Sequence, residues 1–183
     1  MKATKILMDE HRVIERVLSV LEAAVAKAER GEAVRPGMFL EAADFIKEFA
    51  DGSHHHKEEG VLFEAMAAAG VPREAGPIAV MLSEHERARA YTRAIREAAQ
   101  RWERGDTAAV SQVATAARGY AALLRQHIAK EDQILFPMAE QAIPRGKHDS
   151  VIAAFDQVEP EAVRASVHAK YVALAEALER EIA

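Results

Sequence analysis

The chain has 183 residues, no cysteine, and 24 Lys and Arg against 29 Asp and Glu, for a formal net charge of -5. The absence of cysteine excludes thiolate catalysis, cysteine-ligated metal sites and a disulfide framework. The acidic balance gives no reason to expect a nucleic-acid partner, and apolar runs of only a few residues give none to expect a membrane-spanning helix.

The positions of Gly and Pro predict an all-α fold, because these helix-breaking residues divide the chain into long uninterrupted segments. Between these breaks, apolar residues recur every three or four positions, the period of an amphipathic helix. We predict helices over about 4–30, 38–69, 77–104 and 106–137, with Pro137 at a kink or an end, and a fifth helix from Pro160. The N-terminal segment has charged residues from Lys2 onward and lacks the apolar core of a signal peptide, so we expect a cytoplasmic location.

Four long helices joined by short loops predict an up-down-up-down four-helix bundle. We expect a single domain over residues 1–183, with the bundle at about 4–140 and a C-terminal helical extension at about 147–183. The additional helix should cover one side of the bundle or form a homodimer contact.

The bundle segments contain a faint internal duplication. Residues 8–11 resemble 82–85, and residues 54–63 resemble 127–136. The first two predicted helices therefore look like a copy of the next two, and such a bundle would have two equivalent half-sites at its centre.

Each predicted bundle helix carries a histidine on its apolar face. These are His11, His54 or His55, His85 and His127. A carboxylate follows four residues later on two of the helices, and residues four apart lie on one helical face. The pairs are His127 with Glu131, and either His55 with Glu59 or His54 with Glu58.

Burying these groups would cost several kcal/mol unless they are paired or bound to metal. Salt bridges to Lys57, Lys130 or Arg89 on a solvated face are the alternative, but the apolar residues that follow each Glu indicate packed turns. Imidazole and carboxylate without sulfur favour iron, manganese, zinc or copper. Four His and two Glu exceed the needs of one tetrahedral zinc ion and suit two ions with about two of ~12 coordination positions left open.

The order of these motifs resembles the hemerythrin-like, or HHE cation-binding, domain over about residues 4–140. The resemblance implies a four-helix bundle with a non-haem di-iron centre, its two Fe ions joined by an oxo or hydroxo bridge, with Zn or Mn as possible substitutes. Its metal ligands, carried over by motif, would be His11, a His and a Glu on the second helix, His85, His127 and Glu131.

The register of the second helix has two solutions. The duplication pairs His54 with His127 and Glu58 with Glu131. The family's own motif selects His55 and Glu59, and Glu59 also lies four residues before Phe63, on the same apolar stripe. We prefer His55 and Glu59 and leave the other pair open.

Two departures from the reversible oxygen carriers of this family bear on function. Arg89 stands where those carriers place a second histidine one turn after His85, and Glu131 follows His127 at four residues instead of an Asp at five. A lost imidazole would open one iron to a diatomic or peroxide ligand.

The resemblance therefore implies a protein that binds or reacts with O2, NO or peroxide, in stress response or iron–sulfur repair. Tyr120, seven residues before His127 on the same face, could contact such a ligand or simply pack in the core. No residue is predicted as a dedicated catalytic group, so an enzymatic activity is left open. The alternatives are an iron- or oxygen-sensing module that signals through a partner or dimer, and a metal-free structural bundle.

Overall fold

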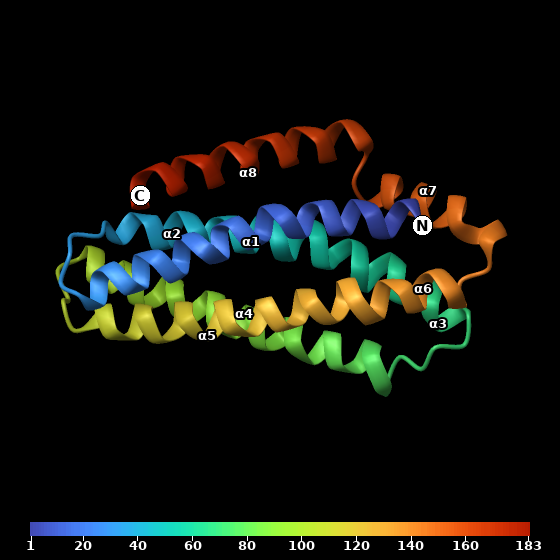
Figure 1. Cartoon of the computed structure of the whole chain (residues 1–183), viewed down its shortest axis with the longest axis horizontal. Coiled ribbons are helices and arrows are strands. Elements are labelled where there is room, and N and C mark those ends of the chain that lie inside the picture. Colours follow the sequence, from blue (N-terminus) through green and yellow to red (C-terminus); the bar gives the residue numbers. More distant parts are fainter.

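A computed structural model describes all residues, 1–183, and contains helices but no strand (Figure 1). The elements in chain order are α1 (Lys2–Glu29), α2 (Pro36–Phe45), η1 (Ile46–His55), η2 (Glu58–Leu62), α3 (Phe63–Ala68), α4 (Gly76–Glu103), α5 (Ala109–Lys130), η3 (Glu131–Leu135), α6 (Phe136–Ala142), η4 (Arg145–Lys147), α7 (His148–Val158) and α8 (Glu161–Ile182). The predicted all-α fold is confirmed.

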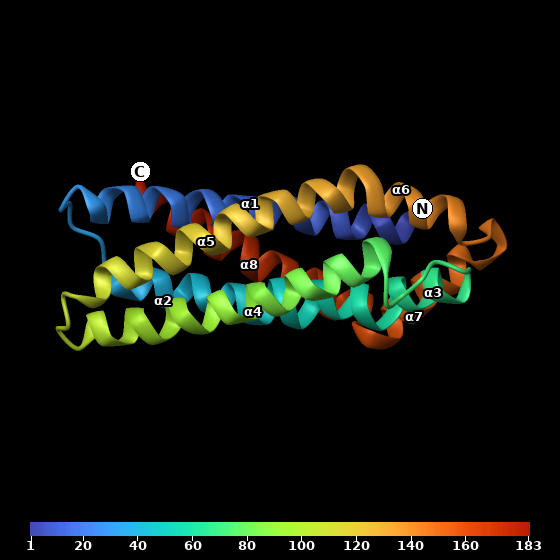
Figure 2. The same cartoon turned by 90° about the horizontal axis from the view of Figure 1, so that it is seen from below.

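Four long helical stretches form the bundle, namely α1, α2 to α3, α4, and α5 to α6. α4 packs along α5, α1 against α5, and α2 against α4, and both views show the stretches running up and down in turn (Figures 1 and 2). Gly70 and Gly105 follow two of the stretches with φ of +96° and +97°, a conformation that lets the chain leave a helix without strain. The predicted bundle topology is confirmed.

The second and fourth bundle helices contain π-helical turns where they pass the centre. The backbone N–H of Phe63 donates to the carbonyl of Glu58, and that of Phe136 donates to the carbonyl of Glu131. Each such i→i+5 hydrogen bond adds one residue to a turn and shifts the following register, and such turns are frequent at functional sites. The fourth helix continues through Pro137 to Ala142, so of the two predicted alternatives, a kink or an end, the end does not occur.

The apolar interior is divided into two clusters by a polar layer. One cluster lies toward the loops after α1 and α4 and includes Leu18, Phe49, Ile95 and Leu124. The other lies toward the opposite end and includes Leu7, Phe63, Met81 and Phe136. The bundle histidines come between these segments in every helix, so the candidate site occupies the boundary between two apolar regions.

The C-terminal extension contains two helices, α7 and α8, where only the helix from Pro160 was predicted. α8 lies along α1 and buries Tyr171, Ala175 and Leu178 in the larger apolar cluster. Arg16 on α1 donates to both carboxylate oxygens of Glu179 at 2.8 and 2.7 Å. The extension therefore covers one side of the bundle within the same chain.

None of the helices combines the length and the apolar character that crossing a membrane requires.

Candidate metal centre

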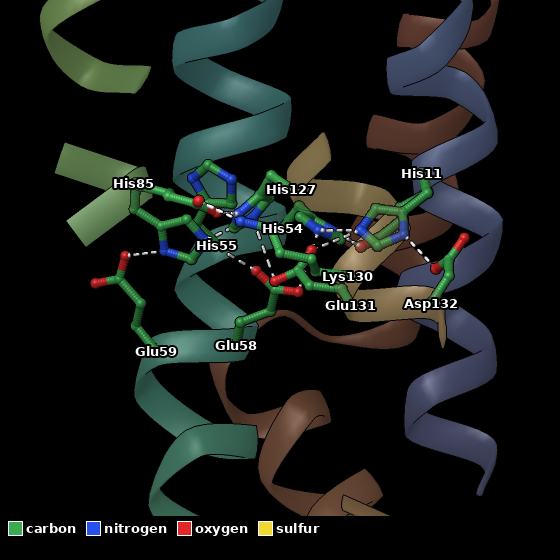
Figure 3. Close-up of polar contacts among 12 residues, drawn as sticks. His11, His54, His55, Glu58, Glu59, His85, His127, Lys130, Glu131 and Asp132 are labelled. Atoms are coloured by element: carbon green, nitrogen blue, oxygen red, sulfur yellow. Dashed lines mark hydrogen bonds and ion pairs between the residues drawn. The ribbon is translucent and has the colours of Figure 1, made fainter. Parts of the chain in front are cut away.

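Side chains from all four bundle helices converge in the polar layer (Figure 3). Their potential ligand atoms form two groups, in each of which all atoms lie within 4.8 Å of one another. The three-histidine group contains His55, Glu58, His85 and His127, and the two-histidine group contains His11, His54, Glu58 and Glu131. All of these side chains are buried, and Glu58 belongs to both groups.

Most of the residues predicted for the site lie in these groups. His11, His55, His85, His127 and Glu131 are members, whereas Glu59 is not. His54 and Glu58, the pair left open, are both present, so the second helix contributes two imidazoles and one carboxylate. That these side chains bind metal remains a prediction.

The exclusion of Glu59 corrects the preferred register and has a cause in the backbone. Counting back from Phe63 with an α-helical period selected Glu59, but the π-helical turn brings Glu58, five residues before Phe63, onto the inner face. The Glu58 side chain is 0% exposed and that of Glu59 is 26% exposed. The internal duplication, which pairs Glu58 with Glu131, was the sequence feature that pointed to the carboxylate found in the two groups.

The imidazoles meet in pairs at the centre. Nε2 of His11 lies 3.0 Å from Nε2 of His54, and Nε2 of His85 lies 3.1 Å from Nε2 of His127. The ring of His55 stacks on that of His85 with their centroids 3.8 Å apart. Two neutral imidazoles cannot both direct lone pairs at this distance without a proton or a cation between them.

Every one of these imidazoles has its other nitrogen, Nδ1, on a carboxylate. The Nδ1 partners are Asp132 for His11 at 2.7 Å, Glu10 for His54 at 2.9 Å, Asp51 for His55 at 3.3 Å, Glu59 for His85 at 2.7 Å and Glu84 for His127 at 2.9 Å. A carboxylate only accepts, so Nδ1–H is the donor and Nε2 is left for another partner. Carboxylate–histidine pairs of this kind orient metal-binding imidazoles and raise their basicity.

Cationic side chains form ion pairs with these carboxylates. Lys57 contacts Glu10 at 2.9 Å, and Lys130 contacts Glu84. Arg89, at the position where an imidazole was expected to be lost, instead holds Asp51 and Glu59, each at 2.7 Å. The hydrogen bond from His127 and the charge of Lys130 lower the pKa of Glu84 to about 2, so this carboxylate stays ionised.

The duplication extends through these supporting residues. Glu10 and Glu84 each precede a histidine of the centre and contact a histidine of the next bundle helix, His54 and His127 respectively. Glu59 and Asp132 each follow a central carboxylate and contact a histidine from the other copy of the duplication, His85 and His11 respectively (Figure 3). Sequence reasoning missed Glu10, Glu84 and Asp132, although all three lie in or beside the duplicated segments.

His55 breaks the symmetry. When the two copies of the duplication are aligned with His54 on His127, the position equivalent to His55 is occupied by Ile128. One half of the centre therefore has three imidazoles and the other has two. Arg89 still stands in place of a second histidine on α4, but His55 from the second helix brings a third imidazole to the group of His85 and His127.

The central carboxylates have no hydrogen-bond partners. Both oxygens of Glu58, both oxygens of Glu131 and Nε2 of His55 are buried without one. Each carboxylate oxygen lies 3.2 to 3.5 Å from an imidazole Nε2, so the oxygens have ion-pair contacts but no well-formed hydrogen bond. A bound cation would satisfy them more fully. The donors are nitrogen and oxygen only, so the residues present fit the iron that the resemblance implied.

Protons occupy the centre when metal is absent. Burial alone would lower the pKa of His54, but the carboxylates of Glu58 and Glu10 outweigh it and raise the pKa to about 10. Burial likewise acts against His127, whose pKa is raised to about 10 by Glu131, Glu84 and Glu58. The protonated Nε2 atoms then lie 3.3 Å from Glu58 in the case of His54 and 3.2 Å from Glu131 in the case of His127, where a metal ion would bind.

Metal binding must therefore release protons. At neutral pH we expect the metal-free protein to release at least two protons per chain on loading, from His54, His127 and also His11, whose pKa burial would lower but Asp132 and Glu131 raise, because metal binds the neutral imidazole. A weakly buffered titration with an indicator dye measures this, and apparent metal affinity should rise with pH. Loading without proton release would contradict this electrostatic description.

The comparisons with known proteins agree with this site. A family model described as the hemerythrin HHE cation binding domain matches residues 2–139. Uncharacterized proteins of Mycobacterium bovis and Mycobacterium tuberculosis are each 23% identical over 153 residues, covering 84% of this chain but only 59% of theirs. No solved structure matches the chain. Because the family model covers most of the chain and all members of both groups, the protein belongs to the hemerythrin HHE cation-binding domain family.

Proposed function

We propose that the protein is a non-haem di-iron protein that binds or reacts with O2, NO or peroxide. The observation that carries this proposal is that all four oxygens of Glu58 and Glu131 are buried between two sets of imidazoles, in contact with their Nε2 atoms but without a well-formed hydrogen bond. His55, His85 and His127 would hold one iron, His11 and His54 the other, and the two carboxylates would bridge them.

The donor count leaves room for a small ligand. Five imidazoles and two bridging carboxylates supply nine donor atoms, and a solvent-derived bridge fills two more positions, so about one of ~12 remains open. This is one fewer than the sequence alone suggested, because His55 and His54 both take part. The open position would belong to the two-histidine half.

The iron pair would supply the electrons, while the chain controls geometry and access. Carboxylates on every Nδ1 fix the ring orientations, and the apolar clusters on both sides of the polar layer exclude water. A role in stress response or iron–sulfur repair follows from family analogy, which fold alone cannot establish.

The reaction is tested with iron-loaded protein. We expect about two irons per chain, and visible charge-transfer bands that change on addition of peroxide, NO or O2. His127→Ala should lose these bands and any turnover, and zinc-loaded wild-type protein, which is redox-inert, should show no spectral response. Unchanged turnover in His127→Ala would refute the proposal.

Neighbouring carboxylates give a matched test of the ligand set. Glu58→Gln removes the residue shared by both groups and should leave well under two metals per chain. Glu59→Gln weakens the contacts of Glu59 with His85 and Arg89 but removes no member of either group, so it should keep the stoichiometry, with affinity reduced by about 10- to 100-fold. Metal content and competition with a chelator measure both. A greater loss in Glu59→Gln than in Glu58→Gln would invalidate the assignment.

A second candidate function, iron or oxygen sensing, is favoured by one buried network. Nζ of Lys57 contacts Glu10 at 2.9 Å and Glu159 at 2.6 Å, and Glu10 holds His54. Glu159 lies between α7 and α8. The network therefore connects the centre to the junction of the C-terminal extension, where a partner or a second copy could detect metal occupancy.

Limited proteolysis tests this connection. Metal loading should protect the α7–α8 junction in wild-type protein, because a fixed His54 fixes Glu10 and Lys57. Glu159→Gln should remove most of that protection, whereas Glu161→Gln, which alters an exposed carboxylate two residues away, should retain it. Identical cleavage of metal-free and loaded wild-type protein would exclude the sensing function.

A further inference from the structure

A cavity of about 380 Å³ opens between η1 and α4 and reaches the three-histidine half of the centre. His55 and Tyr120 line its inner part, and both side chains are buried. The volume lies near the lower end of the range of small-molecule pockets, about 300–1,000 Å³. The cavity can therefore admit a ligand that is larger than a diatomic gas.

The charge of this cavity is opposite to that of the protein. Four of its lining side chains are cationic, and one, Asp51, is anionic, in a chain of net charge -5. The cationic residues are Lys47, Arg89, Arg93 and Arg96. Lys47 and Arg93 form no ion pair, so their charges are available to a ligand.

The cationic lining belongs to one half of the duplicated bundle. When the two copies of the duplication are aligned with His11 on His85, the positions of Arg89, Arg93 and Arg96 correspond to Glu15, Ser19 and Glu22 of α1. The centre's own residues are largely repeated in both halves, but this set of charges is not. The cations are therefore a local feature of the cavity beside His55 and not a general property of the bundle surface.

Tyr120, another residue that lines the cavity, has a hydroxyl that can donate a hydrogen bond. The Tyr120 side chain is fully buried, and its hydroxyl has no hydrogen-bond partner. A buried hydroxyl of this kind usually has a partner. Tyr120 lines the same cavity as the cations, so an anion inside it would accept from the hydroxyl and lie in the field of the arginines.

We propose that this cavity is a binding site for a small anion, held by the Tyr120 hydroxyl and by Arg93 and its neighbouring cations beside the metal centre. The anion would lie next to His55, on the three-histidine side, outside the open coordination position expected at the two-histidine side. The proposal rests on the proposed function for the identity of the neighbouring centre, but anion binding itself does not require iron.

Azide is the probe, because its infrared stretching band shifts on binding and reports whether it is bound to metal. Azide is titrated into metal-free and zinc-loaded protein at constant ionic strength, and the metal content of each sample is measured. We expect saturable binding in both forms. Tyr120→Phe should weaken it about tenfold, because it removes a hydrogen bond to a charged ligand. Arg93→Gln should weaken it about threefold, as expected for one exposed charge.

Arg87→Gln is the matched control, because it removes an exposed charge from the same helix outside the cavity. It should leave azide affinity unchanged. The proposal is overturned if azide does not bind either form, if it binds only with zinc and is insensitive to Tyr120→Phe, or if all three variants weaken it equally. The zinc content of the same samples reports separately on whether the centre holds two metal ions.

Discussion

The structure depends on a buried layer of carboxylates and imidazoles that have no adequate partners among themselves. Four oxygens of Glu58 and Glu131 are enclosed without hydrogen bonds, and two pairs of Nε2 atoms face each other at 3.0 and 3.1 Å. Charges removed from water in this way destabilise a fold unless another charge compensates. Protons can compensate partly, but metal ions satisfy all of these atoms together. The layer therefore suits a bound cation, and apolar clusters lie on either side of it.

The support around this layer explains how its geometry is held. Each imidazole is oriented by a carboxylate, and the carboxylates are in turn neutralised by Lys57, Lys130, Arg12 or Arg89. Several of these contacts join one half of the duplicated bundle to the other, so the halves cannot separate without exposing unpaired charges. The duplication gives two similar groups of candidate metal ligands, and His55 makes them unequal. In the proposed di-iron protein, this inequality would leave the open position at the two-histidine group, while the cationic cavity lies beside the three-histidine group.

The fold could be predicted because its determinants are local. Helical period, Gly and Pro breaks, and short loops depend on neighbouring residues, and they gave the four bundle helices and their order. The same period placed His11, His85, His127 and Glu131 on inner faces. The short helix α7 was missed because it lies between stronger breaks at Pro144 and Pro160.

The remaining errors have non-local causes. A π-helical turn shifts the register by one residue, and it forms where the bundle requires a carboxylate at the centre, so no count of α-helical turns could choose Glu58 over Glu59. The carboxylates on Nδ1 come from other helices, and their role depended on the packed arrangement. The internal duplication pointed to Glu58 and to the carboxylates on Nδ1, because equivalent residues of the two copies make the same side-chain contacts.

The central claim is that two metal ions lie between the two histidine groups, joined by Glu58 and Glu131. Anomalous diffraction at the iron absorption edge, from crystals of iron-loaded protein, tests it most directly. The account predicts two peaks per chain, one within reach of His55, His85 and His127 and one within reach of His11 and His54, with both carboxylates between them. A single peak, or a metal bound by Glu59 in place of Glu58, would contradict it.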